Sequence, residues 1–276
     1  MSVRFRRGAP LALAVLALVS FHGPAPVAAG SAFDQPEAEM VRLINQDRAE
    51  AGLVPYRTYS LLNKIANSRS YDMATKHYFS HRQPDGRTAF DMIDASGITW
   101  YSAAEDIAWN NWSDAEGSAL MANNQWMGSS AHRAAIMSTA YNYIGVGMQI
   151  DSSNGHRIWT ALFLKAPDHT GGWAAFNPQP DTTSDGSTVT TEATSPRSVT
   201  VSWRGGDIRL SSLTAGFDHY QVRKRTDANA WVYWSHDTTR TSRSFTAYPG
   251  HVYRTSVRAC DKRGNCGAWT YIAVSG

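Results

Sequence analysis

The stretch WMGSSAHRAAIM, residues Trp126 to Met137, connects a predicted helix to a glycine-punctuated strand. At its centre, His132 offers a group that serves near neutral pH as an acid, a base or a metal ligand. The neighbouring Arg133 can hold a carboxylate or a phosphate through two parallel hydrogen bonds. A lone histidine is more often a hydrogen-bonded structural residue than a site. Other polar residues must therefore converge on His132 before this stretch marks a function.

The beginning of the chain is typical of a secretory signal. Three arginines precede an apolar run from Ala9 to Val19, and small residues lead to Ala29. The run is shorter than the ~20 residues that a membrane span needs. We therefore expect residues 1–29 to be a signal peptide, and the mature protein to be secreted and extracellular without a transmembrane anchor.

Charge separates the predicted modules. The chain has 26 Lys+Arg and 23 Asp+Glu, so loss of the three signal arginines leaves the mature protein formally neutral. Nucleic-acid binding is not expected, because it needs a basic surface on the working domain. From Pro196 onward, however, 12 basic residues face 5 acidic ones. That excess favours an anionic cell-wall polymer as partner, and scattered solvated arginines are the equally supported alternative.

The two cysteines, Cys260 and Cys266, are separated by five residues in a protein expected to leave the reducing cytosol. A disulfide across a hairpin is the natural interpretation. Two free thiols or a metal pair fit less well, because a structural zinc site needs about four ligands.

Hydrophobic spacing and capping residues predict helices before strands. The expected helices run from Asp34 to Ala51, from a Ser60 cap to Lys76, in a short segment capped by Thr88, and from about Asp114 to Met127. A capping box of Ser113 and Glu116 begins the last one, which should bury Leu120 and Met121. Strands Ile144–Ile150 and Arg157–Leu164 form a hairpin. This order predicts an α+β domain over residues 30–166.

A second module follows a change in composition. Asn177 to Ser195 is rich in Pro, Thr, Ser, Asp and Gly, and we assign residues 167–195 to a linker. Residues 196–276 alternate between apolar and polar residues, which predicts an all-β sandwich. The alternating segments are Val199–Trp203, His219–Arg223, Trp231–Trp234 and Val252–Ala259.

Two further polar motifs precede the opening stretch. His77 and His81 are four residues apart, as in the zinc-protease pattern H-E-x-x-H, but Tyr78 occupies the position of the essential glutamate. Glu105 lies in AEDIAW among small and apolar residues. A carboxylate buried there without a partner would cost several kcal/mol, so Glu105 needs a partner or solvent.

Five blocks in order resemble the bacterial branch of the CAP superfamily, which includes cysteine-rich secretory proteins, antigen 5 and plant pathogenesis-related proteins. The resemblance covers about Gln35 to Leu164. It rests on MVRLINQDRAEAGLVP, HYFSHRQPDGRTAFDMI, AEDIAW, WMGSSAHRAAIM and YIGVGMQI. What it implies is a three-layer α-β-α sandwich whose cleft collects two histidines and acidic residues.

Carried over to this sequence, the resemblance places the cleft histidines at His81 and His132 and the acidic residue at Glu105. It implies that these three hold a divalent metal, with zinc the first expectation. Ser129 is nearest to a second family glutamate, and Arg133 completes the predicted binding cleft. The sequence departs from the family at Ala131, Ala135 and Asp106, where the family usually has Gly, Asn and Asn.

The C-terminal segment is similar to a fibronectin type III domain. Trp203 matches an inner tryptophan, Tyr253 matches a corner tyrosine, and YRTSVRACDKRGNCGAW matches a late strand and turn. An immunoglobulin-like module is the close alternative. Such a module implies a spacer or an adhesive tether.

Function is predicted as ligand binding in the His81–Glu105–His132 cleft, the ligand being a lipid, a peptide or a wall fragment. The sequence has no Gly-x-Ser-x-Gly elbow, no H-E-x-x-H pattern and no cysteine in the first domain. One alternative is a metal-assisted extracellular peptidase or nuclease that uses the same residues. Another is a cell-surface adhesion protein led by the basic β-module.

Overall fold

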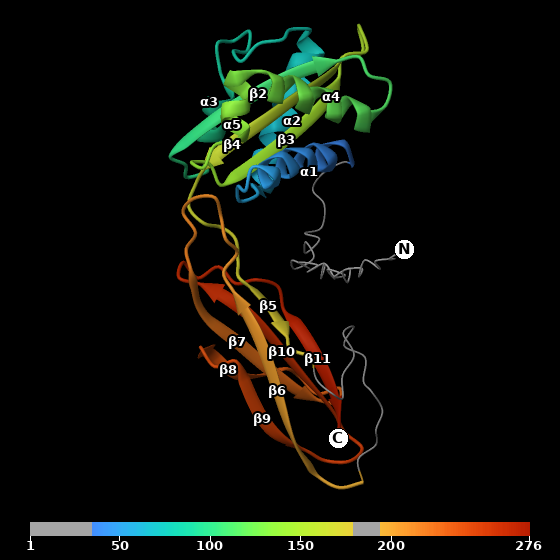
Figure 1. Cartoon of the computed structure of the whole chain (residues 1–276), viewed down its shortest axis with the longest axis vertical. Helices are drawn as coiled ribbons and strands as arrows, with labels where there is room; N and C mark the ends of the chain where they lie inside the picture. The colour runs from blue at the N-terminus through green and yellow to red at the C-terminus, as the bar shows by residue number, and fades with distance from the viewer. Residues whose placement is uncertain (1–34, 179–193) are drawn as a thin grey trace, which may run out of the picture. The chain divides into compact units, whose positions relative to one another are not determined.

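The computed structural model describes residues 35–178 and 194–276, so the expected signal peptide lies outside the described residues. The first part of the chain alternates helices with the strands of one sheet (Figure 1). Its elements are α1 (Gln35–Glu50), β1 (Arg57–Thr58), α2 (Ser60–Lys76), α3 (Ala89–Ala95), β2 (Ser102–Asn110), α4 (Ala115–Gly128), α5 (Ser130–Ile136), β3 (Tyr143–Ile150) and β4 (Arg157–Lys165). The predicted α+β class is confirmed.

The sheet has the strand order β1-β3-β4-β2. The predicted β3–β4 hairpin is antiparallel, β2 pairs antiparallel with β4, and β1 pairs parallel with β3. Strand β2 is therefore an edge strand, and one row of its backbone groups faces away from the sheet.

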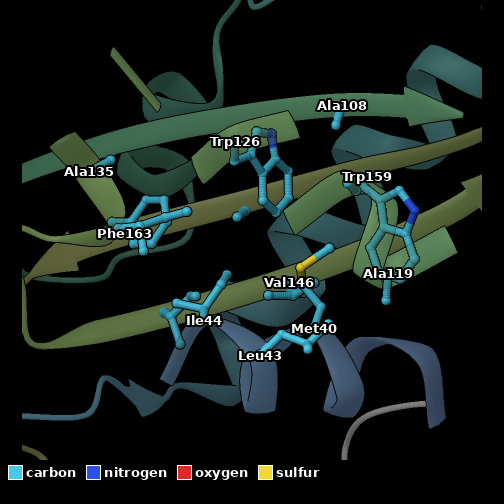
Figure 2. Close-up of a cluster of buried hydrophobic side chains, with 14 of the residues drawn as sticks. Met40, Leu43, Ile44, Ala108, Ala119, Trp126, Ala135, Val146, Trp159 and Phe163 are labelled. Carbon is cyan, nitrogen blue, oxygen red and sulfur yellow. The ribbon is translucent and has the colours of Figure 1, made fainter. Parts of the chain in front are cut away.

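Two groups of buried side chains use opposite faces of this sheet. One joins α1, α4 and α5 to it, and Figure 2 shows its members Met40, Trp126 and Phe163. The other joins α2 and α3 to it and includes Leu62. The neighbours Leu162 and Phe163 in β4 belong to different groups, as the two-residue period of a strand requires.

Glycines in β3 let α2 approach the sheet closely. A Cβ added to Gly145 would lie 2.5 Å from the backbone of Leu62, and one added to Gly147 would lie 2.2 Å from the backbone nitrogen of Asn67. The Ser70 hydroxyl donates to the Gly147 carbonyl at 3.0 Å. The glycines of the YIGVGMQI block are thus required by helix–strand packing.

Two local predictions for α4 were wrong. Its N-cap is Asp114 rather than Ser113, and the Asp114 carboxylate accepts the Gly117 amide at 2.6 Å. Leu120, expected to be buried, is 49% exposed. The buried face consists of small residues and Trp126, because the helix packs close to its neighbours. The Thr88 cap of α3 is confirmed, with the Asp91 side chain completing a capping box.

The C-terminal part is all β. Two antiparallel sheets have the orders β11-β10-β7-β8 and β5-β6-β9. Their strands are β5 (Trp173–Phe176), β6 (Arg197–Gly206), β7 (Phe217–Thr226), β8 (Val232–Thr238), β9 (Ser242–Ala247), β10 (Val252–Asp261) and β11 (Thr270–Ser275). Strand β5 lies within the segment expected to be linker and pairs with β6.

The disulfide and two aromatic residues of this module can be compared with the sequence predictions. Cys260 and Cys266 form the predicted disulfide. Trp203 is 1% exposed within the core, and the Tyr253 hydroxyl accepts the Tyr248 amide at 3.1 Å. A tyrosine that bonds back to nearby backbone also occurs in immunoglobulin-like sandwiches. The fibronectin type III assignment stays a prediction.

We predict that Gly147→Ala lowers the free energy of unfolding by about 1–3 kcal/mol, because the new methyl group must push α2 from β3. Urea denaturation measures the change. Gly128→Ala is the matched control, since a Cβ at Gly128 meets nothing within 4 Å. Equal stability of the Gly147 variant and the wild type would contradict this account of the packing.

Candidate functional site

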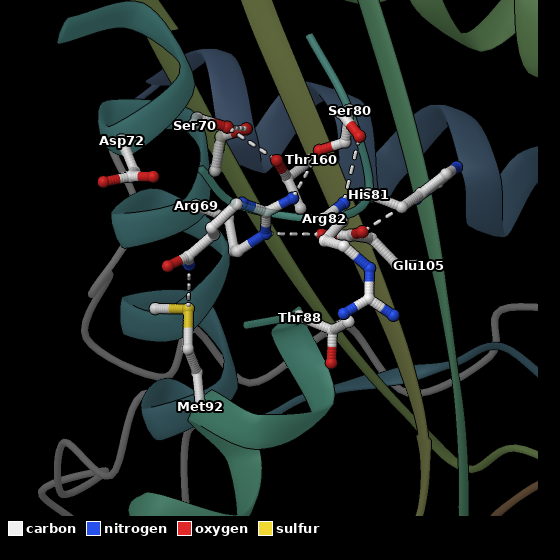
Figure 3. Close-up of polar contacts among 12 residues, drawn as sticks. Arg69, Ser70, Asp72, Ser80, His81, Arg82, Thr88, Met92, Glu105 and Thr160 are labelled. Carbon is white, nitrogen blue, oxygen red and sulfur yellow. Dashed lines mark hydrogen bonds and ion pairs between the residues drawn. The ribbon is translucent and has the colours of Figure 1, made fainter. Parts of the chain in front are cut away.

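A buried ion pair holds the centre of the predicted site (Figure 3). The Arg69 Nε donates to Glu105 Oε1 at 2.9 Å, and the two side chains are 0% and 4% exposed. His81 Nδ1 lies 2.8 Å from Glu105 Oε2, with its own side chain 57% exposed. An ionised carboxylate only accepts, so this ring nitrogen is the donor. Both oxygens of Glu105 are therefore occupied by protein donors.

Arg69 is also fixed by its other nitrogens. They donate to the Tyr78 hydroxyl at 2.9 Å and to the Ser80 carbonyl at 2.8 Å. The Tyr78 hydroxyl in turn donates to Asp72 Oδ2 at 2.6 Å. Thus Tyr78, which occupies the position of a glutamate in the zinc-protease pattern, orients the arginine that holds Glu105.

Sequence reasoning missed Arg69, although two signals pointed to it. The first is the requirement that Glu105 have a partner. The second is spacing, because Arg69 follows Leu62, Ile65 and Ala66 on the inward stripe of α2. A charged residue on such a stripe needs an opposite charge within the domain.

His132 lies on α5, near enough to His81 for the two rings to interact electrostatically. Burial lowers the pKa of His132, and the charge of His81 lowers it further. His132 is therefore a neutral imidazole at neutral pH. The structure thus brings three predicted residues into one region, with Glu105 and His81 in contact and His132 nearby.

A cavity of about 570 Å³ adjoins this region, and its wall includes His132 and Ser129. The cavity runs along the edge strand β2 from Ile107 to Asn110 and continues to Trp112. Its other lining residues are Phe79, Asn111, Met121, Gln125 and Trp126. Arg133 is exposed on α5 and is not among the lining residues.

Trp112 is an exposed aromatic residue held in a fixed position. It is 45% exposed, yet its indole nitrogen donates to the Asp114 carboxylate at 3.1 Å and its amide donates to Asn110 Oδ1 at 3.2 Å. Arg157 donates to the Trp112 carbonyl. A Cβ added to Gly117 would lie 2.0 Å from the indole nitrogen, so only glycine leaves room for the ring.

Trp126 lines the same cavity with a side chain that is almost wholly buried. Its side chain is 1% exposed, and its indole nitrogen has no hydrogen-bond partner among the described residues. In Figure 2 this nitrogen lies on the side of the ring nearest β2. An unpaired buried N–H costs about 1–3 kcal/mol.

The residues predicted to bind metal do not fit a metal in this arrangement. Glu105 is engaged by the Arg69 guanidinium, so a cation would be placed beside an existing buried positive charge. His81, Glu105 and His132 do not bring three ligand atoms within 4.8 Å of one another. Within the described ranges, the group that does is Asp168, Asp207 and Asp261.

Asp106 is a buried carboxyl next to Glu105 in β2, on the opposite face of the strand. It is 3% exposed, and its Oδ2 has no hydrogen-bond partner within the described part of the chain. Burial raises the pKa of Asp106 to about 8, and the charge of Glu105 adds to the shift. Asp106, which stands where the resemblance leads one to expect Asn, is thus neutral at pH 7.

Residues 41–163 match the CAP family, described as the cysteine-rich secretory protein family. The predicted CAP resemblance is confirmed, and this segment is a CAP domain. The uncharacterised protein YkwD of Bacillus subtilis (strain 168) is 34% identical over 128 residues, which make up 46% of this chain and 46% of YkwD. The uncharacterised membrane protein YlbC of the same strain is 28% identical over 129 residues, 47% of this chain and 34% of YlbC. The chain therefore spans less than half the length of these curated relatives.

Solved structures with similarity to this chain have low overlap scores. An extracellular protein containing an SCP domain from Bacillus anthracis gives a TM-score of 0.41 at 22% identity, over 47% of this chain and 40% of that one. An outer surface protein of Borrelia burgdorferi gives 0.43 at 18% identity, over 48% and 94%. A cysteine-rich secretory protein of Staphylococcus aureus gives 0.37 at 21% identity, over 47% and 38%.

We predict that removing one member of the buried pair destabilises the domain more than removing both. Arg69→Met and Glu105→Leu should each lower the free energy of unfolding by about 3–5 kcal/mol, because each leaves an uncompensated buried charge. The double variant should recover part of that loss. Urea denaturation of all four proteins gives the coupling energy. Additive losses would mean that the two side chains do not stabilise each other.

The pH dependence of stability tests Asp106. Its pKa is about 8 in the folded protein against 3.8 as the reference value, so between these pH values the folded state binds more protons than the unfolded state. Stability contributed by this group therefore falls as pH rises from 4 to 8 and is constant above. Asp106→Asn should match the wild type near pH 4 and be more stable at pH 8. Denaturation at both pH values measures this, with the 83% exposed side chain of Asp237 changed to Asn as control. If the stability difference between Asp106→Asn and the wild type were the same at pH 4 and pH 8, the burial argument would be contradicted.

Proposed function

We propose that the chain is a secreted, non-enzymatic binding protein whose CAP domain holds an uncharged, amide-bearing wall fragment in the cavity beside β2. The observation that carries this proposal is the cavity wall, which combines fixed exposed aromatic rings with uncharged polar groups. Pockets of this composition bind a ligand through apolar area and orient it through a few polar contacts. Of the three predicted ligands, a lipid, a peptide and a wall fragment, only the wall fragment has both kinds of group. Its sugar rings can stack on indoles, and its amide groups can form hydrogen bonds.

The polar groups of the cavity support a neutral ligand. The lining residues include no Asp, Glu, Lys or Arg, and the lowered pKa of His132 keeps its ring uncharged. The exposed amide side chains of Asn111 and Gln125 in the lining can exchange hydrogen bonds with the amide of an N-acetyl group or a peptide. The outward row of β2 backbone groups can pair with the same kind of amide.

Binding is favoured over hydrolysis by the state of Glu105. A general base must reach a water, whereas the Glu105 side chain is 4% exposed and is held by hydrogen bonds from Arg69 and His81. Glu105 is also absent from the cavity lining. In this proposal the Arg69–Glu105–His81 group supports the cavity and performs no chemistry. Metal binding stays a prediction of the family resemblance and has no part in the proposed function.

Location outside the cell is part of the same proposal. It rests on the predicted signal peptide and on the Cys260–Cys266 disulfide, which is typical of an oxidising compartment. No helix of the described segments is long and apolar enough to cross a membrane. The β-module would then act as the tether or spacer of the CAP domain.

Calorimetry with a purified disaccharide-peptide from peptidoglycan, its carboxyl groups amidated, tests the proposal. Trp112→Ala should weaken binding at least about tenfold, since it removes a pre-positioned aromatic surface, and a tenfold loss corresponds to about 1.4 kcal/mol. Gly117→Ala should weaken binding as well, because its methyl group displaces the Trp112 ring. Tyr71→Ala is the control, as Tyr71 is 59% exposed and does not line the cavity.

Palmitate and the stem peptide alone serve as competing ligands in the same assay. Tighter binding of either one than of the disaccharide-peptide would overturn the choice of ligand class. Cleavage of the fragment that is lost in Glu105→Gln would instead establish the hydrolase alternative.

A further inference from the structure

The outer face of the β11-β10-β7-β8 sheet carries a row of alternating arginine and tryptophan side chains. Arg225 lies 4.9 Å from the Trp231 ring centroid, and Arg223 lies 4.7 Å from the same ring. Arg223 also lies 4.1 Å from the Trp269 centroid, and Arg258 lies 4.6 Å from it. The row therefore reads Arg225, Trp231, Arg223, Trp269, Arg258, and we call it the Arg–Trp ladder.

The strands place these residues on one face. Arg223 and Arg225 are two apart in β7, so their side chains leave the same side of the sheet. Arg258 in β10 is the register partner of Gln221, which lies two residues before Arg223 in β7 and therefore on the same face. Arg258 donates two hydrogen bonds to Gln221 Oε1, at 2.9 and 2.7 Å. The register of the sheet thus builds a row from residues distant in sequence.

The ladder is a cluster of positive charge without a matching negative charge. In the part of the chain that the structure describes, no Asp or Glu forms a salt bridge with its three arginines. The Nε atoms of Arg223 and Arg225 are buried without a hydrogen-bond partner. Nearby acids are engaged elsewhere, with Asp218 on His219 and Asp227 on His251. Like charges placed together without a counter-charge repel, and an anion bound across them would remove this cost.

The tryptophans orient the guanidinium groups. Guanidinium stacks on an aromatic ring with its N–H edge directed outward, and that edge matches an oxyanion bidentately. Each of the two indoles already has two guanidinium groups against it. These contacts leave less indole surface for stacking on bases or sugars, which is the mode of single-stranded nucleic-acid binders.

We propose that the Arg–Trp ladder binds an anionic polymer whose charges lie on tetrahedral oxyanions, phosphate or sulfate. The ladder presents a row of guanidinium edges, so a repeating polyanion contacts several of them at once. This site belongs to the β-module and is separate from the uncharged cavity of the CAP domain. It gathers three of the 12 basic residues of the segment 196–276 in one place.

The test measures binding of the full-length protein to inorganic polyphosphate and to heparin at about 0.1 M salt. The double variant Arg223→Gln/Arg225→Gln should lose at least about tenfold in affinity for the preferred polymer, with a shallower salt dependence because fewer counterions are released. The preferred polymer identifies phosphate or sulfate as the oxyanion. Arg240→Gln/Arg263→Gln is the charge-matched control, since both side chains are exposed outside the ladder.

The ladder also stabilises the module, so folding must be checked by thermal unfolding and tryptophan circular dichroism. Arg258→Gln, at the end of the row, provides a milder variant that should still weaken binding. Unchanged affinity in a folded ladder variant would show that the ladder is only structural and overturn the proposal. Equal loss in the control variant, or binding to single-stranded DNA but to neither base-free polymer, would overturn it as well.

Discussion

The Arg69–Glu105 ion pair is the constraint from which the CAP domain's site is built. It joins α2 to the edge strand β2 inside the domain, where neither charge is tolerated alone. Once Arg69 fixes one oxygen of Glu105, the other oxygen fixes His81. The loop between α2 and α3 is then held against β2, and the backbone of Ser80 is bound by the same arginine. The polar centre of the domain thus acts as a brace for the neighbouring cavity.

The cavity depends on this brace and on the edge position of β2. A strand with one free edge exposes backbone groups to whatever lies beside it. Here α4 and α5 place Trp126 and His132 beside that edge, while the loop before α4 fixes Trp112. The rings are held before any ligand binds, so little ordering entropy opposes binding. This surface differs from a packed core because its aromatic side chains are exposed and yet fixed in position.

Sequence patterns predicted the elements well where periodicity and turn residues agreed, as in α2, β3 and β4. They also identified Glu105 as needing a partner, which Arg69 and His81 supply, while the role of His132 in a site stays a prediction. The patterns missed α5, because seven residues form too short a helix for its period to be recognised. They missed Arg69 as the partner of Glu105 and the role of Trp112, because both depend on contacts between distant segments. Arg133, adjacent to His132, was placed by sequence proximity alone, and on a helix adjacent side chains point in different directions.

Charge divides the two proposed sites. The CAP cavity is lined by uncharged groups, with His132 kept neutral by burial, whereas the Arg–Trp ladder gathers three cations. A neutral cavity gains little from long-range attraction, so its ligand must be recognised by fit. A row of guanidinium groups attracts its partner from a distance and weakens with added salt. A ladder held on an anionic polymer would keep the CAP domain near neutral wall fragments. Local concentration would then compensate for modest affinity in the cavity.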